Sequence, residues 1–222
     1  MDDRELEGLK EKLKGKTILG MDEVGRGCLA GPLVVGCVVL NGDTFIDGLN
    51  DSKKLNKKKR EIILKSIKRE AKDCSLCYIS AKKIDEFGIS KSLELAYSLA
   101  LSEINVIPDF ILIDGNINFL KNVINKDARK ISFDLDVKRF ENVPIITIIK
   151  GDGKISAISA ASILAKQSRD HYMELVSDIY PEYGFSDHVG YGTKKHLDAI
   201  KEKGILGIHR RSFRPISEVL KN

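Results

Sequence analysis

Residues 17–40 read TILGMDEVGRGCLAGPLVVGCVVL, and this stretch predicts two strands joined by a glycine-rich loop. Residues 17–23 form the first strand and end in a pair of acids, Asp22 and Glu23. Residues 33–40 are a continuous apolar run, which is typical of a strand at the centre of a sheet. Three glycines and a proline between the two strands favour a loop. The stretch therefore predicts the start of a sheet with two acids at one strand end.

The rest of the chain alternates between helical and strand patterns. Helical periodicity and capping residues predict helices at 2–14, 56–72, 90–105, 155–178 and 193–203, with a loop at 184–192 and a short helix at the end. Apolar runs predict further strands at 44–46, 75–80, 109–114 and 143–149. This order fits a mixed sheet flanked by helices, in the α/β class. We expect three parts: an N-terminal helical extension at 1–16, a core at 17–178 and a C-terminal helical region at 179–222.

Length and composition fit one large folded domain. Of the 222 residues, 42% are apolar and 31% are charged, which is ordinary for a folded chain and argues against a disordered one. No apolar run approaches the roughly 20 residues that a bilayer-spanning helix needs. Residues 1–16 are charged and contain no apolar segment of the signal-peptide type. We therefore expect a cytoplasmic protein that is monomeric and has no membrane partner.

Positive charge is concentrated in one segment. The formal net charge is +5, and residues 51–70 carry nine Lys or Arg against three acids. This pattern permits a polyanionic partner such as a nucleic acid, although a solvated helix face explains the same charges. The chain has no Trp and few aromatic residues, which argues against a base-stacking platform for single strands. If a nucleic acid binds, we expect its backbone to be held.

Cys74 and Cys77 form a C-x-x-C pair in a segment with the pattern of a strand. A redox or zinc half-site is one interpretation, but two such side chains point to opposite faces of a strand. The sequence contains no second C-x-x-C or H-x₃-H that would complete a zinc site. Small, partly buried strand residues are the favoured interpretation, and a cytosolic chain would keep its cysteines reduced.

Acids recur at the ends of three predicted strands. Asp22 and Glu23 end the first strand, Asp114 ends another, and Asp152 lies just beyond the last. If these strands run parallel, their carboxyl ends meet at one edge, where open α/β sheets place their sites. Four carboxylates together repel one another and require cations, and hard oxygen ligands favour Mg²⁺ or Mn²⁺. Two such ions can stabilise the attacking and leaving oxygens of a phosphodiester.

Other interpretations of these acids stay open. Asp-Gly is a common turn pair, so Asp114 or Asp152 taken alone is more often a turn residue. Adjacent residues of a regular strand point to opposite faces, so Asp22 and Glu23 share a site only if the strand bends. The glycines that follow allow such a bend. The metal-site prediction therefore depends on the four acids as a set.

Six ordered segments resemble the ribonuclease HII family, the type 2 ribonucleases H. They are GMDEVGRGCLAGPLVVG at 20–36, DSKKL at 51–55, ILIDG at 111–115, KGDGKISAISAASILAKQSRD at 150–170, GYGTKKH at 190–196 and HRRSFRP at 209–215. A lone D-E-x-G motif is weak evidence, whereas these matches cover the chain from about Lys16 to its end. The resemblance implies an RNase H-like fold with a five-stranded mixed sheet and a C-terminal helical region that binds substrate.

The resemblance also implies functional residues. The catalytic and metal-binding acids of the family fall on Asp22, Glu23, Asp114 and Asp152. The family's G-R-G motif, whose loop meets the backbone around a ribonucleotide 2′-OH, falls on Gly25, Arg26 and Gly27. Glycines allow such close approach, and the 2′-OH distinguishes RNA from DNA. Type 3 enzymes usually have Lys at the position of Arg26 and an extra N-terminal domain, so this chain resembles type 2.

Further substrate contacts are expected from the same resemblance. Tyr191 matches the family's substrate-stacking tyrosine, whereas structural roles are favoured for Tyr180 and Tyr183. Lys53 is a candidate for phosphate contact by analogy. Four further residues recur at helical spacing and can share one helix face: Ser159, Ser162, Lys166 and Arg169. Phosphate contact is one interpretation of this face, and a packing edge of the helix is the alternative.

The predicted reaction is metal-dependent hydrolysis of the RNA strand of RNA–DNA hybrids. The resemblance further implies cleavage 5′ of single ribonucleotides in duplex DNA, with two Mg²⁺ or Mn²⁺ ions, leaving 3′-OH and 5′-phosphate ends. One alternative is another nuclease on the same fold, which would cut all-DNA duplex. A second is a non-catalytic, basic nucleic-acid-binding module. A replication clamp is a further candidate partner, although the C-terminal tail carries no clear clamp-binding motif.

Overall fold

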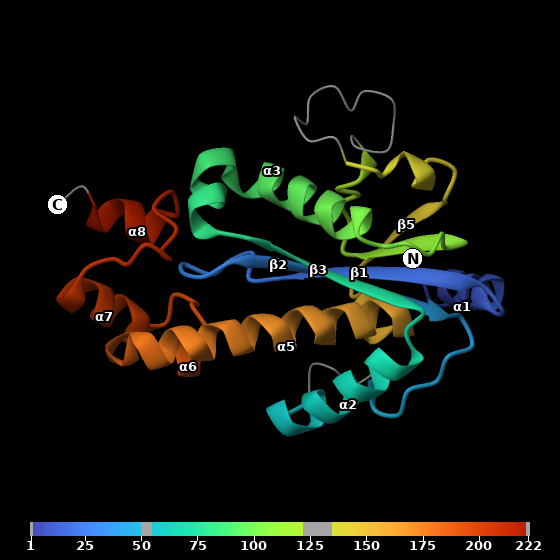
Figure 1. The fold of residues 1–222 in the computed structure, drawn as a ribbon, viewed down its shortest axis with the longest axis horizontal. Helices are drawn as coiled ribbons and strands as arrows, with labels where there is room; N and C mark the ends of the chain where they lie inside the picture. The colour runs from blue at the N-terminus through green and yellow to red at the C-terminus, as the bar shows by residue number, and fades with distance from the viewer. Residues whose placement is uncertain (1, 50–54, 122–134, 221–222) are drawn as a thin grey trace.

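A five-stranded mixed sheet forms the centre of the computed structural model, which describes residues 2–49, 55–121 and 135–220 (Figure 1). Its strands are β1 (Thr17–Val24), β2 (Leu33–Asn41), β3 (Asp73–Ile79), β4 (Phe110–Asp114) and β5 (Ile145–Ile148). The spatial order is β3-β2-β1-β4-β5, with β1, β4 and β5 parallel and with β2 antiparallel to β1 and β3. The predicted α/β class and five-stranded mixed sheet are confirmed.

Helices cover both faces of this sheet (Figure 1). Helix α3 (Ala81–Ser102) covers one face, while α1 (Asp3–Leu13), α2 (Lys57–Glu70) and α5 (Ser156–Ile179) lie on the other. Each face has its own apolar core, because successive residues of β1 and β2 point alternately to the two sides. Among the helices of the described residues, none combines the length and apolar character needed to cross a bilayer.

Helix α5 lies directly against β1 and β2 because two strand glycines leave room for it. A Cβ at Gly20 would overlap the backbone of Ala157, and a Cβ at Gly36 would meet the Ala161 carbonyl oxygen at 2.6 Å. The small side chains that α5 turns toward the sheet complete this contact. The close packing fixes α5 against the strand that carries the first two acids.

The chain after α5 forms a small helical layer with its own apolar core. Its elements are η5 (Pro181–Tyr183), α6 (Phe185–His188), α7 (Lys194–Lys203) and α8 (Arg214–Val219). The core of this layer includes Met173 from α5 and Leu29 and Ala30 from the glycine-rich loop. The C-terminal helical region therefore packs against the loop that follows β1 (Figure 1).

Several elements differ from the prediction. No strand forms at 44–46, where the chain turns after β2. The helix expected at 90–105 already begins at Ala81, because the Ser80 side chain caps it. A kink at Gly88, where φ is 74°, interrupts the helix. The apolar periodicity of the turns before the kink therefore does not continue into the turns after it. The loop expected at 184–192 contains α6. Two further 3₁₀ turns are η3 (Lys138–Phe140) and η4 (Gly151–Gly153).

The C-x-x-C pair lies in β3, with Cys74 exposed and Cys77 buried. Burial raises the pKa of Cys77 to about 11, which opposes formation of a reactive thiolate. Both cysteines are free thiols. These observations support the structural interpretation over the redox one.

Candidate active site

The four predicted acids lie at one edge of the sheet. Asp22 and Glu23 are near the end of β1, and Asp114 is the last residue of β4. Asp152 lies in η4, shortly after β5. Because β1, β4 and β5 are parallel, their carboxyl ends meet at this edge. The parallel arrangement on which the metal-site prediction depended is therefore present.

Backbone register places Asp22 beside Asp114, because each residue directly follows the last paired residue of β1 and β4. Laterally adjacent residues of a parallel pair point to the same face of the sheet. The Asp114 Oδ1 atom accepts a hydrogen bond of 2.6 Å from the Gly151 backbone N–H. This bond ties the turn that carries Asp152 to the end of β4.

Asp22 and Glu23 point to opposite faces of β1. The hydroxyl of Ser162 on α5 donates to Asp22, whereas the hydroxyl of Tyr97 on α3 donates to Glu23 Oε2 over 2.5 Å. Strand β1 stays paired with β2 to its end, so the bend expected between the two acids does not occur. Both carboxylates nevertheless lie within electrostatic reach of Asp114, because the neighbouring strand ends there. The sheet edge, rather than a bend, brings the acids together.

Negative charge exceeds positive charge among the side chains of the site. Burial raises the pKa of Asp22 well above its usual range, and the charges of Asp114 and Glu23 raise it further. Burial also raises the pKa of Glu23, in opposition to its hydrogen bond from Tyr97 and the charge of Arg26. The Arg26 guanidinium lies 3.7 Å from the Glu23 carboxylate. A divalent cation would relieve this repulsion and favour the charged carboxylates.

The donor set fits Mg²⁺ or Mn²⁺, because all four side chains offer hard carboxylate oxygens. In the part of the chain that the structure describes, no three His, Cys, Asp or Glu side chains are arranged as a ready-made metal site. Mg²⁺ tolerates this, since it keeps several waters and usually takes one or two carboxylates from the protein. Asp22, Glu23 and Asp114 are the electrostatically coupled acids of the site, and the Asp114–Gly151 bond holds Asp152 nearby.

The G-R-G loop begins directly after β1. Gly25 has φ of 85°, and a Cβ there would overlap the side chain of Arg169, so only glycine fits. A Cβ at Gly27 would meet nothing within 4 Å, which leaves the loop open on that side. The Arg26 side chain is 53% exposed, and its carbonyl accepts a 2.9 Å hydrogen bond from Arg210. The loop thus presents a cation and accessible backbone beside the acids.

Tyr191 lies against the same loop, with the residue 45% exposed. Its hydroxyl is hydrogen-bonded with the thiol of Cys28. The Leu29 backbone N–H donates to the carbonyl of Gly190 over 2.8 Å. Tyr191 and Arg26, the two candidate recognition residues, therefore come from segments that are bonded to each other.

Two of the four helix-face candidates are fully buried. Ser159 donates to the carbonyls of Asp152 and Ile155. The Arg169 guanidinium donates to three carbonyls between 2.7 and 3.0 Å away, those of Ala30, Pro32 and Val189. Direct phosphate contact by these two side chains is not favoured, because neither is accessible. The alternative of a packing edge describes them better: Ser159 holds the Asp152 turn, and Arg169 holds the loop.

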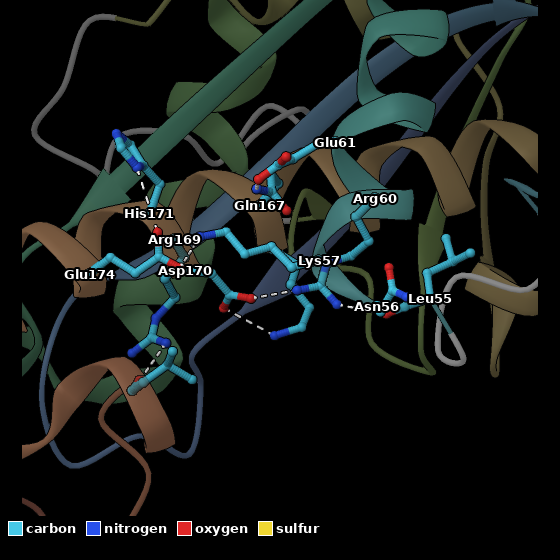
Figure 2. A network of polar contacts seen from close by, with 12 residues as sticks. Leu55, Asn56, Lys57, Arg60, Glu61, Gln167, Arg169, Asp170, His171 and Glu174 are labelled. Carbon is cyan, nitrogen blue, oxygen red and sulfur yellow. Dashed lines mark hydrogen bonds and ion pairs between the residues drawn. The ribbon is translucent and has the colours of Figure 1, made fainter.

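Ser162 and Lys166 are partly exposed on α5 and stay candidates for phosphate contact. The Lys166 Nζ atom lies 3.0 Å from Asp170, which also pairs with Arg60 of α2 at 3.1 Å. Figure 2 shows this α2–α5 contact, in which Arg60 also donates to the Leu55 carbonyl. Lys53 lies outside the described residues.

Sequence patterns do not single out Tyr97 or Arg210, which support Glu23 and Arg26. Tyr97 fits the apolar face of a helix, and nothing local marks its contact with Glu23. Arg210 belongs to the HRRSFRP segment, where a basic residue reads as a surface charge, although the residue is fully buried. The structural role favoured for Tyr183 is consistent with its burial and with its hydrogen bond to the Gly204 carbonyl.

Comparisons with known proteins identify the family and the fold. Residues 19–216 match the family model described as Ribonuclease HII. Ribonuclease HII of Mycoplasma capricolum subsp. capricolum is 41% identical over 202 residues, which are 91% of this chain and 88% of the relative. The crystal structure of ribonuclease H2 from Pyrococcus horikoshii OT3 has a TM-score of 0.75 at 25% identity, covering 92% of this chain and 97% of that one. The ribonuclease HII of Archaeoglobus fulgidus, solved in complex with PCNA, shares the fold, with a TM-score of 0.69 at 23% identity over 89% and 95% of the two chains.

Proposed function

Because this chain belongs to the ribonuclease HII family, whose members are ribonuclease H endonucleases acting on the RNA strand of RNA–DNA hybrids, we propose a finer specificity. The enzyme also cuts 5′ of single ribonucleotides embedded in duplex DNA, leaving 3′-OH and 5′-phosphate ends. One observation carries this proposal: Arg26 lies 3.7 Å from the Glu23 carboxylate, in a loop that is hydrogen-bonded to the segment carrying Tyr191. A recognition surface of this kind can distinguish one ribonucleotide from its DNA neighbours.

Recognition would begin at the G-R-G loop. The open backbone around Gly27 can approach a 2′-OH closely, which is the group that distinguishes RNA from DNA. The exposed Tyr191 ring can pack against the deoxyribose on the 3′ side. Ser162, Lys166 and Lys53 are the proposed phosphate contacts. Together these groups would place the phosphodiester on the 5′ side of the ribonucleotide at the acids.

The four acids Asp22, Glu23, Asp114 and Asp152 would hold divalent ions at the carboxyl edge. Two Mg²⁺ or Mn²⁺ ions held there would supply an activated water and charge stabilisation for the departing 3′ oxygen. The chain's own residues prepare that edge, because Tyr97 orients the Glu23 carboxylate and Gly151 orients that of Asp114. No Ser or His nucleophile is needed, since water is the attacking group.

Cleavage assays on matched duplexes test the proposal. The wild type should cut a DNA duplex with one embedded ribonucleotide when Mg²⁺ is present, at the 5′ side of that ribonucleotide only. An RNA–DNA hybrid should also be cut, and an all-DNA duplex of the same sequence should stay intact. Asp22→Asn should abolish cleavage but still bind the duplex, because it removes a charge while conserving shape. Normal cleavage by that variant would contradict the assigned metal site.

The same assays separate the alternatives. Cleavage of the all-DNA duplex would indicate another nuclease on this fold. Binding without cleavage, together with no change in melting temperature on adding Mg²⁺, would indicate a basic binding module. The acids argue against that module, since carboxylates beside a phosphate backbone weaken electrostatic binding.

Binding to a replication clamp stays a prediction. The Archaeoglobus fulgidus protein was solved with PCNA, but at 23% identity it carries the fold resemblance alone. Co-sedimentation of the full chain with a sliding clamp would test it.

A further inference from the structure

Three histidines in the C-terminal region are almost fully buried. His188, His196 and His209 are 6%, 0% and 1% exposed. The rings of His188 and His196 stack with their centroids 4.4 Å apart, and Nε2 of His196 lies 3.1 Å from Nε2 of His209. Every ring nitrogen of the three has a partner in the protein, so the cluster does not offer a metal site. The proposed reaction uses none of these rings.

The partners of His196 and His209 determine where the protons lie. Nδ1 of His196 faces the Tyr191 carbonyl oxygen at 2.9 Å, so this nitrogen must donate. Nδ1 of His209 accepts from the Leu206 backbone N–H at 2.8 Å, so it must be bare. The proton between the two Nε2 atoms therefore belongs to His209, and it is donated to His196. Burial lowers the pKa of both rings to about 4, so both are neutral near pH 7.

This pair connects the two recognition segments. His196 holds the carbonyl of Tyr191, and His209 forms an antiparallel bridge with Ala30 in the loop that starts at G-R-G. The next residue, Arg210, donates from its backbone to Leu29 and from its side chain to the Arg26 carbonyl. A path of buried hydrogen bonds thus runs from behind Tyr191 to the loop that carries Arg26.

We propose that the neutral His196–His209 pair is a positioning pair that holds Tyr191 at a set distance from the G-R-G loop, so that Tyr191 and Arg26 meet the substrate as one surface. The inference rests on the proposed function, in which those two residues recognise a ribonucleotide in duplex DNA. Neither histidine touches substrate.

Two substitutions at His196 separate positioning from packing. His196→Leu fills the space but cannot donate to the Tyr191 carbonyl. His196→Asn keeps an N–H donor at roughly the place of Nδ1, while it loses the link to His209 and, like His196→Leu, the ring stacking on His188. For the single-ribonucleotide duplex, His196→Leu should raise KM about fivefold, as expected for partial loss of an aromatic contact, with kcat changed less than twofold. His196→Asn should recover most of this loss.

The effect should also depend on Tyr191 itself. In a Tyr191→Ala background there is no ring to position, so adding His196→Leu should change KM less than twofold. An equal fivefold penalty in both backgrounds would overturn the proposal, because it would show that His196 acts by general packing. If His196→Leu does not fold, His209→Asn takes its place, since it keeps the acceptor for Leu206 and removes the link to His196.

A measurement without catalysis tests the positioning directly. The chain contains no Trp, so Tyr191→Trp introduces a single fluorophore at the site. Adding His196→Leu should lower the fluorescence anisotropy of this Trp, while adding His196→Asn should lower it less. Phe45→Trp, at an 83% exposed position outside the C-terminal layer, is the control and should not respond to either change. Unchanged anisotropy at position 191 in a folded His196→Leu variant would overturn the proposal.

The two kinds of failure are distinguishable. A wild type that does not cut the embedded ribonucleotide would refute the proposed function. The anisotropy experiment would still decide whether the histidine pair positions residue 191.

Discussion

Glu23 depends on a residue far away in the chain. Its carboxylate accepts a 2.5 Å hydrogen bond from the hydroxyl of Tyr97, a fully buried residue of α3. On the opposite face of the sheet, the Ser162 hydroxyl interacts with Asp22 and lowers its pKa, in opposition to burial. Ligating carboxylates are commonly oriented by such partners, and loss of a partner typically lowers metal affinity by roughly 10–100-fold.

Tyr97→Phe should therefore weaken the response to Mg²⁺ while leaving the fold intact. The ring still fills its place in the core, but Glu23 loses the donor that orients it. We expect the Mg²⁺ concentration for half-maximal cleavage to rise roughly tenfold. Initial rates measured across a Mg²⁺ titration check this. Tyr78→Phe, which removes a hydroxyl from an exposed position on β3, is the matched control, and equal responses of the two variants would argue against the role of Tyr97.

Among the elements, the position of helix α5 affects the most site residues. The helix carries Ser162 toward Asp22 and Arg169 toward the loop, so its distance from β1 sets the positions of both. Gly20 allows this distance, because its missing side chain leaves room for the helix backbone at Ala157. At Gly20, the strand lies directly against the backbone of the helix.

Gly20→Ala should destabilise the protein by about 3 kcal/mol, at the upper end for overpacking, because the helix backbone cannot move aside as a side chain can. Gly8→Ala is the control, since a Cβ in that exposed turn of α1 meets nothing within 4 Å. That change should stabilise the protein by about 0.5–1 kcal/mol through helix propensity. Urea unfolding of both variants measures the difference. Equal midpoints would contradict the direct contact between α5 and β1.

For the whole molecule, the recognition surface exists only when the C-terminal layer packs on the core. Arg169 and Arg210 are both fully buried, and each donates to backbone carbonyls of the glycine-rich loop. Arg169 also holds the Val189 carbonyl beside Tyr191. Loop and C-terminal region therefore form one structural unit, although the whole core of the chain lies between them in the sequence.

The buried histidines make this unit sensitive to acid. Burial lowers the pKa of His196 and His209 to about 4 in the folded state, from 6.5 ordinarily. The unfolded chain therefore binds more protons between pH 4 and 6.5, so this contribution to stability is complete above pH 6.5. It is lost as the pH falls toward 4, at a cost of up to about 3 kcal/mol for each ring.

Urea unfolding at pH 7 and pH 5 checks this prediction. The free energy of unfolding should fall less in the double variant His196→Asn/His209→Asn than in the wild type. His188, which stacks on His196, is present in both proteins. Asp22 and Glu23 have raised pKa values and act in the opposite direction, but equally in both. The difference between the two proteins therefore isolates the pair, and identical pH dependence would refute the prediction.

The sequence by itself determined the local features of this protein. The apolar runs at 17–23 and 33–40, the glycines between them and the small residues of α5 specify strands, a loop and a closely packing helix. These features can be predicted because they arise from residues near one another in the chain. The same holds for the acids that end strands, whose positions follow once the strands are located. Short elements and kinked ones were less predictable, as the absent strand at 44–46 and the kink at Gly88 show.

Tertiary structure alone decided how those parts act together. Strand order placed β4 beside β1, so that Asp22 and Glu23 reach Asp114 from opposite faces without a bend. Burial turned Arg169 from a candidate phosphate contact into a support of the loop, and folding brought Tyr97 to Glu23. The physical reason is that pairing and burial depend on contacts between distant segments. The residues next to it in the chain do not indicate which distant segment a residue will contact.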